Sequence, residues 1–145
     1  MLTSITDIHL VSEAIRDAVA PVFLLTGIGS ILNVMVGRLG RAIDRARTVN
    51  SLDPDIRKDH KHELSVTIRR ITLLRIAIGF ATAGALLVCI SIASLFISVE
   101  SGFNISHLVL ISFISSMGAI IVSLICFLRE ILLTSNEAIV SSYLD

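Results

Sequence analysis

Three long charge-free runs constrain the fold of this sequence more than any other feature. They cover residues 18–37, 76–99 and 108–128, which are 20, 24 and 21 residues long. An α-helix rises about 1.5 Å per residue, so each run gives roughly 30 Å of helix or more, enough to cross the hydrocarbon core of a bilayer. The sequence therefore predicts an all-α membrane protein with three transmembrane helices.

The composition agrees with this prediction. Hydrophobic residues make up 54% of the chain, and the mean hydropathy of +0.87 exceeds what a soluble domain of 145 residues needs. The formal net charge is zero, so the chain lacks the overall basic character typical of nucleic-acid-binding proteins. We expect the lipid bilayer as a partner and no nucleic acid.

The segment 38–75 joins the first two runs and differs sharply from them. It holds ten of the twelve Lys and Arg residues against five acids, a net charge of +5. Apolar residues at Leu39, Ile43 and Ala46 continue a helical stripe through its first half, and Asp53-Pro54 supplies a cap and a first-turn proline for a second helix. The sequence predicts that both transmembrane helices extend into a helical hairpin, which turns near residues 50–52.

The distribution of Lys and Arg predicts the orientation of the chain. Short loops rich in these residues stay in the cytoplasm, whereas the loop after the second run has neither Lys nor Arg. We therefore expect residues 38–75 and the tail 129–145 in the cytoplasm and the N-terminus outside.

Residues 4–17 precede the first run and have an amphipathic pattern. Ile5, Ile8, Val11 and Ile15 fall on one helical face, which predicts an interfacial helix before the first span. Three acids in this segment argue against a secretory signal. Pro21 would then lie in the first turn of the span, where its missing amide costs little.

Small and polar residues form a stripe in two of the three runs. Such residues let helix backbones approach closely in lipid, and an Asn side chain can hydrogen-bond across the contact. Both stripes therefore predict helix packing, or the lining of a pore if several copies assemble. The first stripe is Gly27, Ser30, Asn33 and Gly37, and the second is Ser112, Ser116, Ala119 and Ser123.

The second run has small residues of its own. Gly79 and Ala83 have the small-xxx-small spacing of a helix contact, and Gly84 lies on a neighbouring face. The two cysteines, Cys89 and Cys126, lie at different expected depths in separate runs, so we expect no disulfide between them.

Signatures of chemistry are scarce. The sequence has no nucleophile–base motif, phosphate loop or metal motif, and the three runs contain no Asp, Glu, Lys, Arg or His. We expect neither an enzyme nor a secondary transporter, and no cofactor. The region around His60 and His62 leaves open a metal site in an oligomer. Arg38, Arg41 and Arg45 share a face that could bind anionic lipid headgroups or line the cytoplasmic mouth of a pore.

Two stretches resemble a known family, most specifically over residues 33–47. They read APVFLLTGIGSILNVMVGRLGRAIDRAR and CFLREILLTS. Over about residues 20–133 the chain is similar to the small bacterial inner-membrane proteins grouped as a domain of unknown function, DUF2721. The resemblance implies a bacterial membrane location and three spans. It implies no activity and no catalytic residues.

Two functional hypotheses follow from these observations. The first is a homo-oligomeric scaffold or interaction protein of the inner membrane, whose basic hairpin meets a cytoplasmic protein or anionic lipid. The second is an oligomeric ion channel with arginines at its cytoplasmic mouth. Three spans are too few to enclose a conduit within one chain, so a pore would need several copies.

Overall fold

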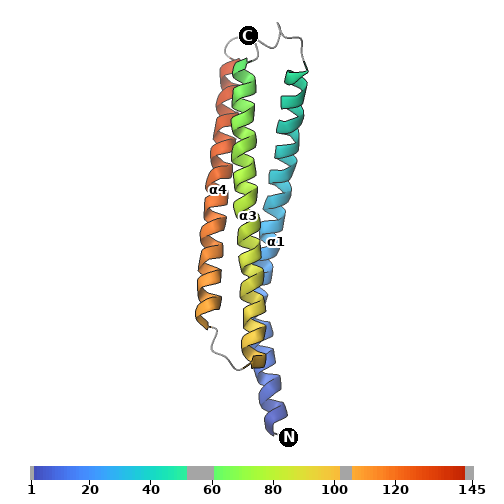
Figure 1. Cartoon of the computed structure of the whole chain (residues 1–145), viewed down its shortest axis with the longest axis vertical. Coiled ribbons are helices and arrows are strands. Elements are labelled where there is room, and N and C mark those ends of the chain that lie inside the picture. Colours follow the sequence, from blue (N-terminus) through green and yellow to red (C-terminus); the bar gives the residue numbers. More distant parts are fainter. Residues whose placement is uncertain (1, 52–60, 102–105, 143–145) are drawn as a thin grey trace. The chain divides into compact units, whose positions relative to one another are not determined.

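The computed structural model consists of three long helices (Figure 1). It describes residues 2–51, 61–101 and 106–142, with side chains described for 11–51, 64–98 and 107–134. Helix α1 is Leu2–Asn50, α3 is Lys61–Ser101 and α4 is Ser106–Ser142. The predicted all-helical fold with three helices long and apolar enough to cross a membrane is confirmed.

Helix α1 has no break between residues 17 and 18. The expected interfacial helix 4–17 is helical but continuous with the first charge-free run, and its location in the membrane interface stays a prediction. Pro21 consequently lies in the helix interior and not in a first turn, contrary to the sequence prediction. A proline inside a membrane helix is tolerated because packing and local adjustment compensate for the lost hydrogen bond.

Helix α1 ends where the charged segment was expected to turn. Its last residue is Asn50, and the amide of Ser51 donates to the carbonyls of Arg47 and Thr48 at 3.0 and 3.2 Å. The segment 38–50 is thus a direct extension of the helix that contains the first run. The Asp53-Pro54 start signal lies outside the described residues, so the turn of the hairpin is untested.

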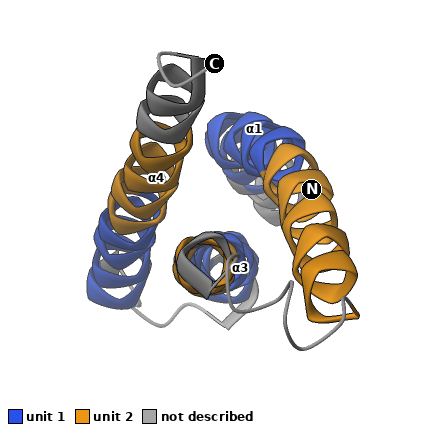
Figure 2. Ribbon diagram, turned by 90° about the horizontal axis from the view of Figure 1, so that it is seen from above, with its two compact units in different colours: residues 1–31, 81–120 blue, residues 32–80, 121–145 orange. Residues whose placement is uncertain are grey.

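The chain divides into two compact units, which Figure 2 colours separately. The first unit comprises residues 1–31 and 81–120. In it, α3 and α4 are joined by serine hydroxyls: Ser91 and Ser112 share a hydrogen bond of 2.6 Å, and Ser116 donates to the carbonyl of Gly84 at 2.9 Å. A Cβ added at Gly84 would lie 3.0 Å from Ile120 Cγ1, so glycine permits this close approach.

The second unit comprises residues 32–80 and 121–145. Its most buried apolar side chains are Met35 of α1 and Leu74 and Ala77 of α3, all fully enclosed. Ser123 of α4 donates to the carbonyl of Ala77 at 2.6 Å. Small residues therefore bring α3 and α4 together in this unit as they do in the first.

Buried positions recur every seven residues along α1 and α3. Seven-residue spacing is typical of helices that pack side chains into holes of a neighbouring helix. On α3 one such series is Thr67, Leu74, Ala81 and Val88. On α1 the series is Ala14, Pro21, Ile28, Met35, Ala42 and Val49.

The outward surfaces are apolar over most of the described length. Phe23, Leu86 and Ile111 are more than three-fifths exposed, and large exposed aliphatic residues accompany them on all three helices. An uncovered apolar surface of this extent is expected of helices in lipid. The fold therefore agrees with a membrane protein.

Candidate functional site

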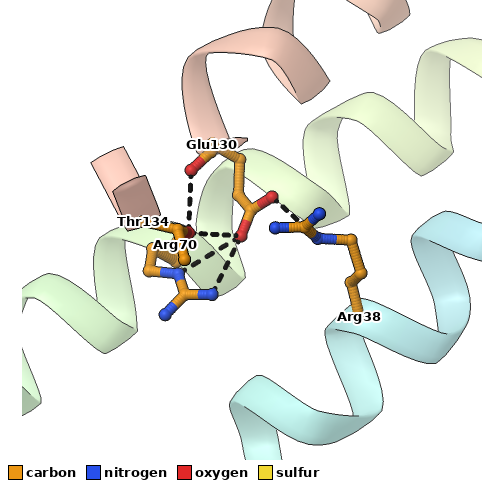
Figure 3. Close-up of polar contacts among 4 residues, drawn as sticks. All are labelled: Arg38, Arg70, Glu130 and Thr134. Atoms are coloured by element: carbon orange, nitrogen blue, oxygen red, sulfur yellow. Dashed lines mark hydrogen bonds and ion pairs between the residues drawn. The ribbon is translucent and has the colours of Figure 1, made fainter. Parts of the chain in front are cut away.

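Three charged residues meet at the ends of the charge-free runs. Arg38 directly follows the first run, Arg70 lies a few residues before the second, and Glu130 lies shortly after the third. All three belong to the second unit, and each comes from a different helix (Figure 3). They form a cluster that we call the Arg38–Arg70–Glu130 triad.

Glu130 is the centre of the triad and is completely buried. Its Oε1 accepts hydrogen bonds from Nε and Nη2 of Arg70 at 3.2 and 3.1 Å. The hydroxyl of Thr134, one turn further along α4, lies 3.0 Å from the Glu130 carbonyl and 3.2 Å from Oε1. The carboxylate is thus held on one side by α3 and by its own helix.

Arg38 approaches the other oxygen of the carboxylate. Its Nε lies 3.2 Å from Oε2, a distance typical of an ion pair, but Oε2 has no hydrogen bond of acceptable geometry. The guanidinium also lies over the ring of Phe127, with Cζ 5.6 Å from the ring centroid. Helix α4 therefore holds Arg38 through an aromatic face and a charge, three residues apart.

The triad carries a net positive charge, because two guanidiniums share one carboxylate. Each arginine side chain keeps about a quarter of its surface exposed, 25% for Arg38 and 23% for Arg70. A buried carboxylate without a partner would be strongly unfavourable, so its position depends on both arginines. The cluster fixes how α1, α3 and α4 are rotated within the second unit.

A groove of about 410 Å³ lies beside the triad. Arg41 and Arg45, which were predicted to share a face with Arg38, line it together with Arg70 of α3. Two threonine hydroxyls complete a largely polar surface. The lining residues are Arg38, Arg41, Ala42, Arg45, Thr67, Arg70 and Thr134.

The serine stripe of the third run lies inside the chain. Ser112, Ser116 and Ser123 are buried and hydrogen-bond to residues of α3, and Ala119 is half-buried near Gly84. Within the described residues these positions are contacts between α4 and α3.

The stripe of the first run has the opposite placement. Gly27, Ser30, Asn33 and Gly37 are all exposed, on the side of α1 away from its buried seven-residue series. Space is open around Gly27, whereas the nearest atom to a Cβ at Gly37 would be an Arg41 nitrogen at 3.9 Å. This stripe makes no helix contact within the described part of the chain.

Sequence reasoning missed Glu130 and Arg70. Glu130 lies just past the third run, where a charge is expected to close the span, and α4 continues beyond it to Ser142. A usable signal was present, because the 4-3 spacing of Ser112, Ser116, Ala119 and Ser123 continues through Cys126 to Glu130. Arg70 follows the buried Thr67 by three residues in the same manner.

The described side chains offer no cluster of metal ligands. In residues whose side chains are described, no group of three or more His, Cys, Asp or Glu lies together. The His60 and His62 region lies outside those residues, so its metal hypothesis stays a prediction. Both cysteines are free thiols.

Comparison with known proteins adds a family but no activity. A family model described as "Protein of unknown function (DUF2721)" matches residues 18–139, which is most of the chain. No curated protein and no solved structure matches.

Proposed function

The chain belongs to the DUF2721 family, whose function is unknown, and we propose that it is a homo-oligomeric membrane protein without catalytic activity that serves as a scaffold. Its basic segment 38–75 would be the element that meets a cytoplasmic protein or anionic lipid. The exposed stripe of α1 carries this proposal.

The stripe combines two properties that favour association of helices. Gly27, Ser30 and Gly37 leave room for another backbone to approach. The hydroxyl of Ser30 donates a hydrogen bond to the carbonyl of Thr26 at 3.1 Å. Placing this serine in lipid therefore costs little free energy.

Asn33 is the exception in this stripe. Its side chain is exposed and makes no hydrogen bond with any residue that the structure describes. An amide in hydrocarbon gains from a partner, by about 1 kcal/mol for a polar contact between membrane helices. Because an amide both donates and accepts, Asn33 of a second copy is a suitable partner, which favours a symmetric self-contact.

The proposed location is the bacterial inner membrane, with the N-terminus outside. Basic residues are concentrated in the segment that joins α1 and α3, and this concentration supports a cytoplasmic location for residues 38–75 and for the C-terminus. The Arg38–Arg70–Glu130 triad would then lie at the cytoplasmic boundary of the membrane.

Native mass spectrometry of the full chain in nanodiscs tests the proposal. We expect an oligomer for the unmodified protein and a shift to monomer for Gly37→Leu and for Asn33→Leu. Val122→Leu is the matched control, because Val122 is an exposed residue of α4 and lies outside the stripe. A monomeric unmodified protein, or a control that dissociates as far as the other two variants, would contradict the proposal.

An oligomeric channel is the second candidate, favoured by the four arginines that line one groove. In this alternative the arginines stand at the cytoplasmic mouth of a conduit between copies. Ion flux through purified protein in liposomes, reduced by Arg41→Glu, is the expected result. Absence of flux in liposomes that contain the oligomer would eliminate the channel.

A further inference from the structure

The groove beside the triad has the chemistry of an oxyanion site, and we propose that it binds a phosphate group. Four guanidiniums and two threonines line it, and no acid is among the lining residues whose side chains are described. Planar guanidiniums match the geometry of phosphate oxygens, and their charge assists each hydrogen bond. A phosphate would be a ligand of the basic segment 38–75, so the proposal rests on the proposed interaction role of that segment. It does not require self-association.

Two of the guanidiniums are already positioned. Glu130 and Phe127 hold Arg38, and Glu130 holds Arg70 through two hydrogen bonds. A ligand therefore does not have to immobilise these side chains, which reduces the entropic cost of binding.

The positioned arginines keep donors to spare. The contacts of Arg70 with Glu130 use Nε and Nη2, and the contact of Arg38 uses Nε. Nη1 of Arg70 and both Nη atoms of Arg38 have no acceptor among the described residues. In Figure 3 the Nη1 end of Arg70 points away from the carboxylate. An oxyanion in the groove would supply these acceptors.

The charge of the groove selects an anion. Glu130 compensates one of the two arginines that it contacts, and it lies beneath the groove and not in its lining. Arg41 adds a positive charge and makes no ion pair with any described residue. Because Ala42 is the one apolar residue among the described lining residues, the groove suits a polar group and not an acyl chain.

The phosphate can come from two sources with the same chemistry. The triad lies at the ends of the charge-free runs, where the headgroups of a bilayer are expected, so a lipid phosphate can reach it. A free phosphate-bearing solute can enter from the aqueous side. The experiment separates the two sources.

Binding is measured on the full chain in two kinds of nanodisc. In phosphatidylcholine discs, inorganic phosphate is titrated and followed by calorimetry. In discs that also contain phosphatidic acid, retained lipid is counted by native mass spectrometry after release. We expect the Arg41→Gln/Arg45→Gln variant to weaken binding in at least one arm by about tenfold or more. This variant leaves Arg38, Arg70 and Glu130 in place, and its helical content is checked by circular dichroism.

Arg47→Gln is the matched control, because Arg47 is an exposed arginine of α1 that is absent from the groove lining. It should bind as the unmodified protein does. Binding of inorganic phosphate in the phosphatidylcholine discs shows that the site takes a free anion. Retention of phosphatidic acid without phosphate binding assigns the site to a lipid headgroup. Both outcomes support the site. No binding in either arm, or equal losses in the control and the double variant, would overturn it. Either of these negative results can occur with an intact oligomer, so they are distinguishable from failure of the proposed self-association.

Discussion

Glu130 carries the largest consequence of any single residue in the second unit. It is fully buried, and it contacts arginines from both other helices. An ion pair of this kind is costly to form, but removing one member is more costly because the remaining charges lose their partner. The triad thus acts mainly as a determinant of helix position.

Glu130→Gln should destabilise the chain by about 3 kcal/mol, the lower end of the range for breaking a buried pair, because the two arginines are partly solvated. Reversible unfolding of the purified protein in mixed micelles measures this change. Combining it with Arg70→Gln in a double-mutant cycle should return a coupling energy well above that of a surface pair.

The neighbouring Arg129→Gln is the control for that measurement. Arg129 is exposed and forms no ion pair with a described residue, so its loss should change stability by less than about 0.5 kcal/mol. Equal effects of the two substitutions would show that the triad contributes no more than a surface charge.

At the scale of the helices, α3 and α4 are held together by small residues more than by bulky ones. The carbonyl of Gly84 accepts from Ser116, and the missing side chain at Gly84 leaves space for Ile120. In lipid, exposed leucines are as well solvated as buried ones, so close packing and hydrogen bonds supply the preference for the folded arrangement.

Gly84→Val should therefore loosen this contact, at a cost of about 1–3 kcal/mol for overpacking. Gly79→Val, in the same helix, should be nearly neutral because a Cβ there meets nothing within 4 Å. Thermal unfolding of the two variants in the same detergent measures the difference. If Gly79→Val lowers the unfolding temperature as much as Gly84→Val does, then helix propensity and not packing governs the effect.

The sequence predicted the helices well and their partners poorly. Charge-free length alone located all three helices, because hydrocarbon leaves the backbone few alternatives. Small-residue spacing does not state which helix is the neighbour: Ser116 meets α3 of its own chain, whereas Asn33 meets no described residue. Of the three glycine and alanine positions noted in the second run, Gly84 is buried and Gly79 and Ala83 are exposed.

The site was harder to predict than the helices. When charged residues near the ends of the spans are counted to predict orientation, a residue such as Glu130 is assumed to be exposed to solvent at the end of its helix. Its burial depends on how α1 and α3 pack against α4 within the second unit, where Met35 and Leu74 are fully buried, and a count of charges does not give this packing. The arginine face at Arg41 and Arg45 was identified, but Arg70 joins it from a distant part of the sequence.

At the scale of the whole molecule, the orientation in the membrane is the property most open to test. Replacing both cysteines by alanine gives a background for single-cysteine labelling. Ser51 and His107 are exposed residues that follow the first run and precede the third. We expect Ser51→Cys to be protected from an impermeant maleimide in intact cells and labelled in inverted vesicles, because basic segments stay inside.

His107→Cys should show the reverse pattern. It is the internal control, because positions 51 and 107 flank α3 and are therefore separated by one membrane crossing. Labelling of Ser51→Cys from outside would reverse the proposed topology, and labelling of both positions from one side would mean that α3 does not cross.

The order in which the chain is synthesised determines when the triad can form. Synthesis proceeds from the N-terminus, so the ribosome delivers Arg38 and Arg70 before it delivers Glu130. Until α4 has been synthesised, Arg38 and Arg70 lack Glu130 as a partner. The last helix therefore supplies the carboxylate that the arginines of the other two share, and a nascent chain that stops before residue 130 differs from the finished protein in the electrostatics of its earlier helices as well as in length.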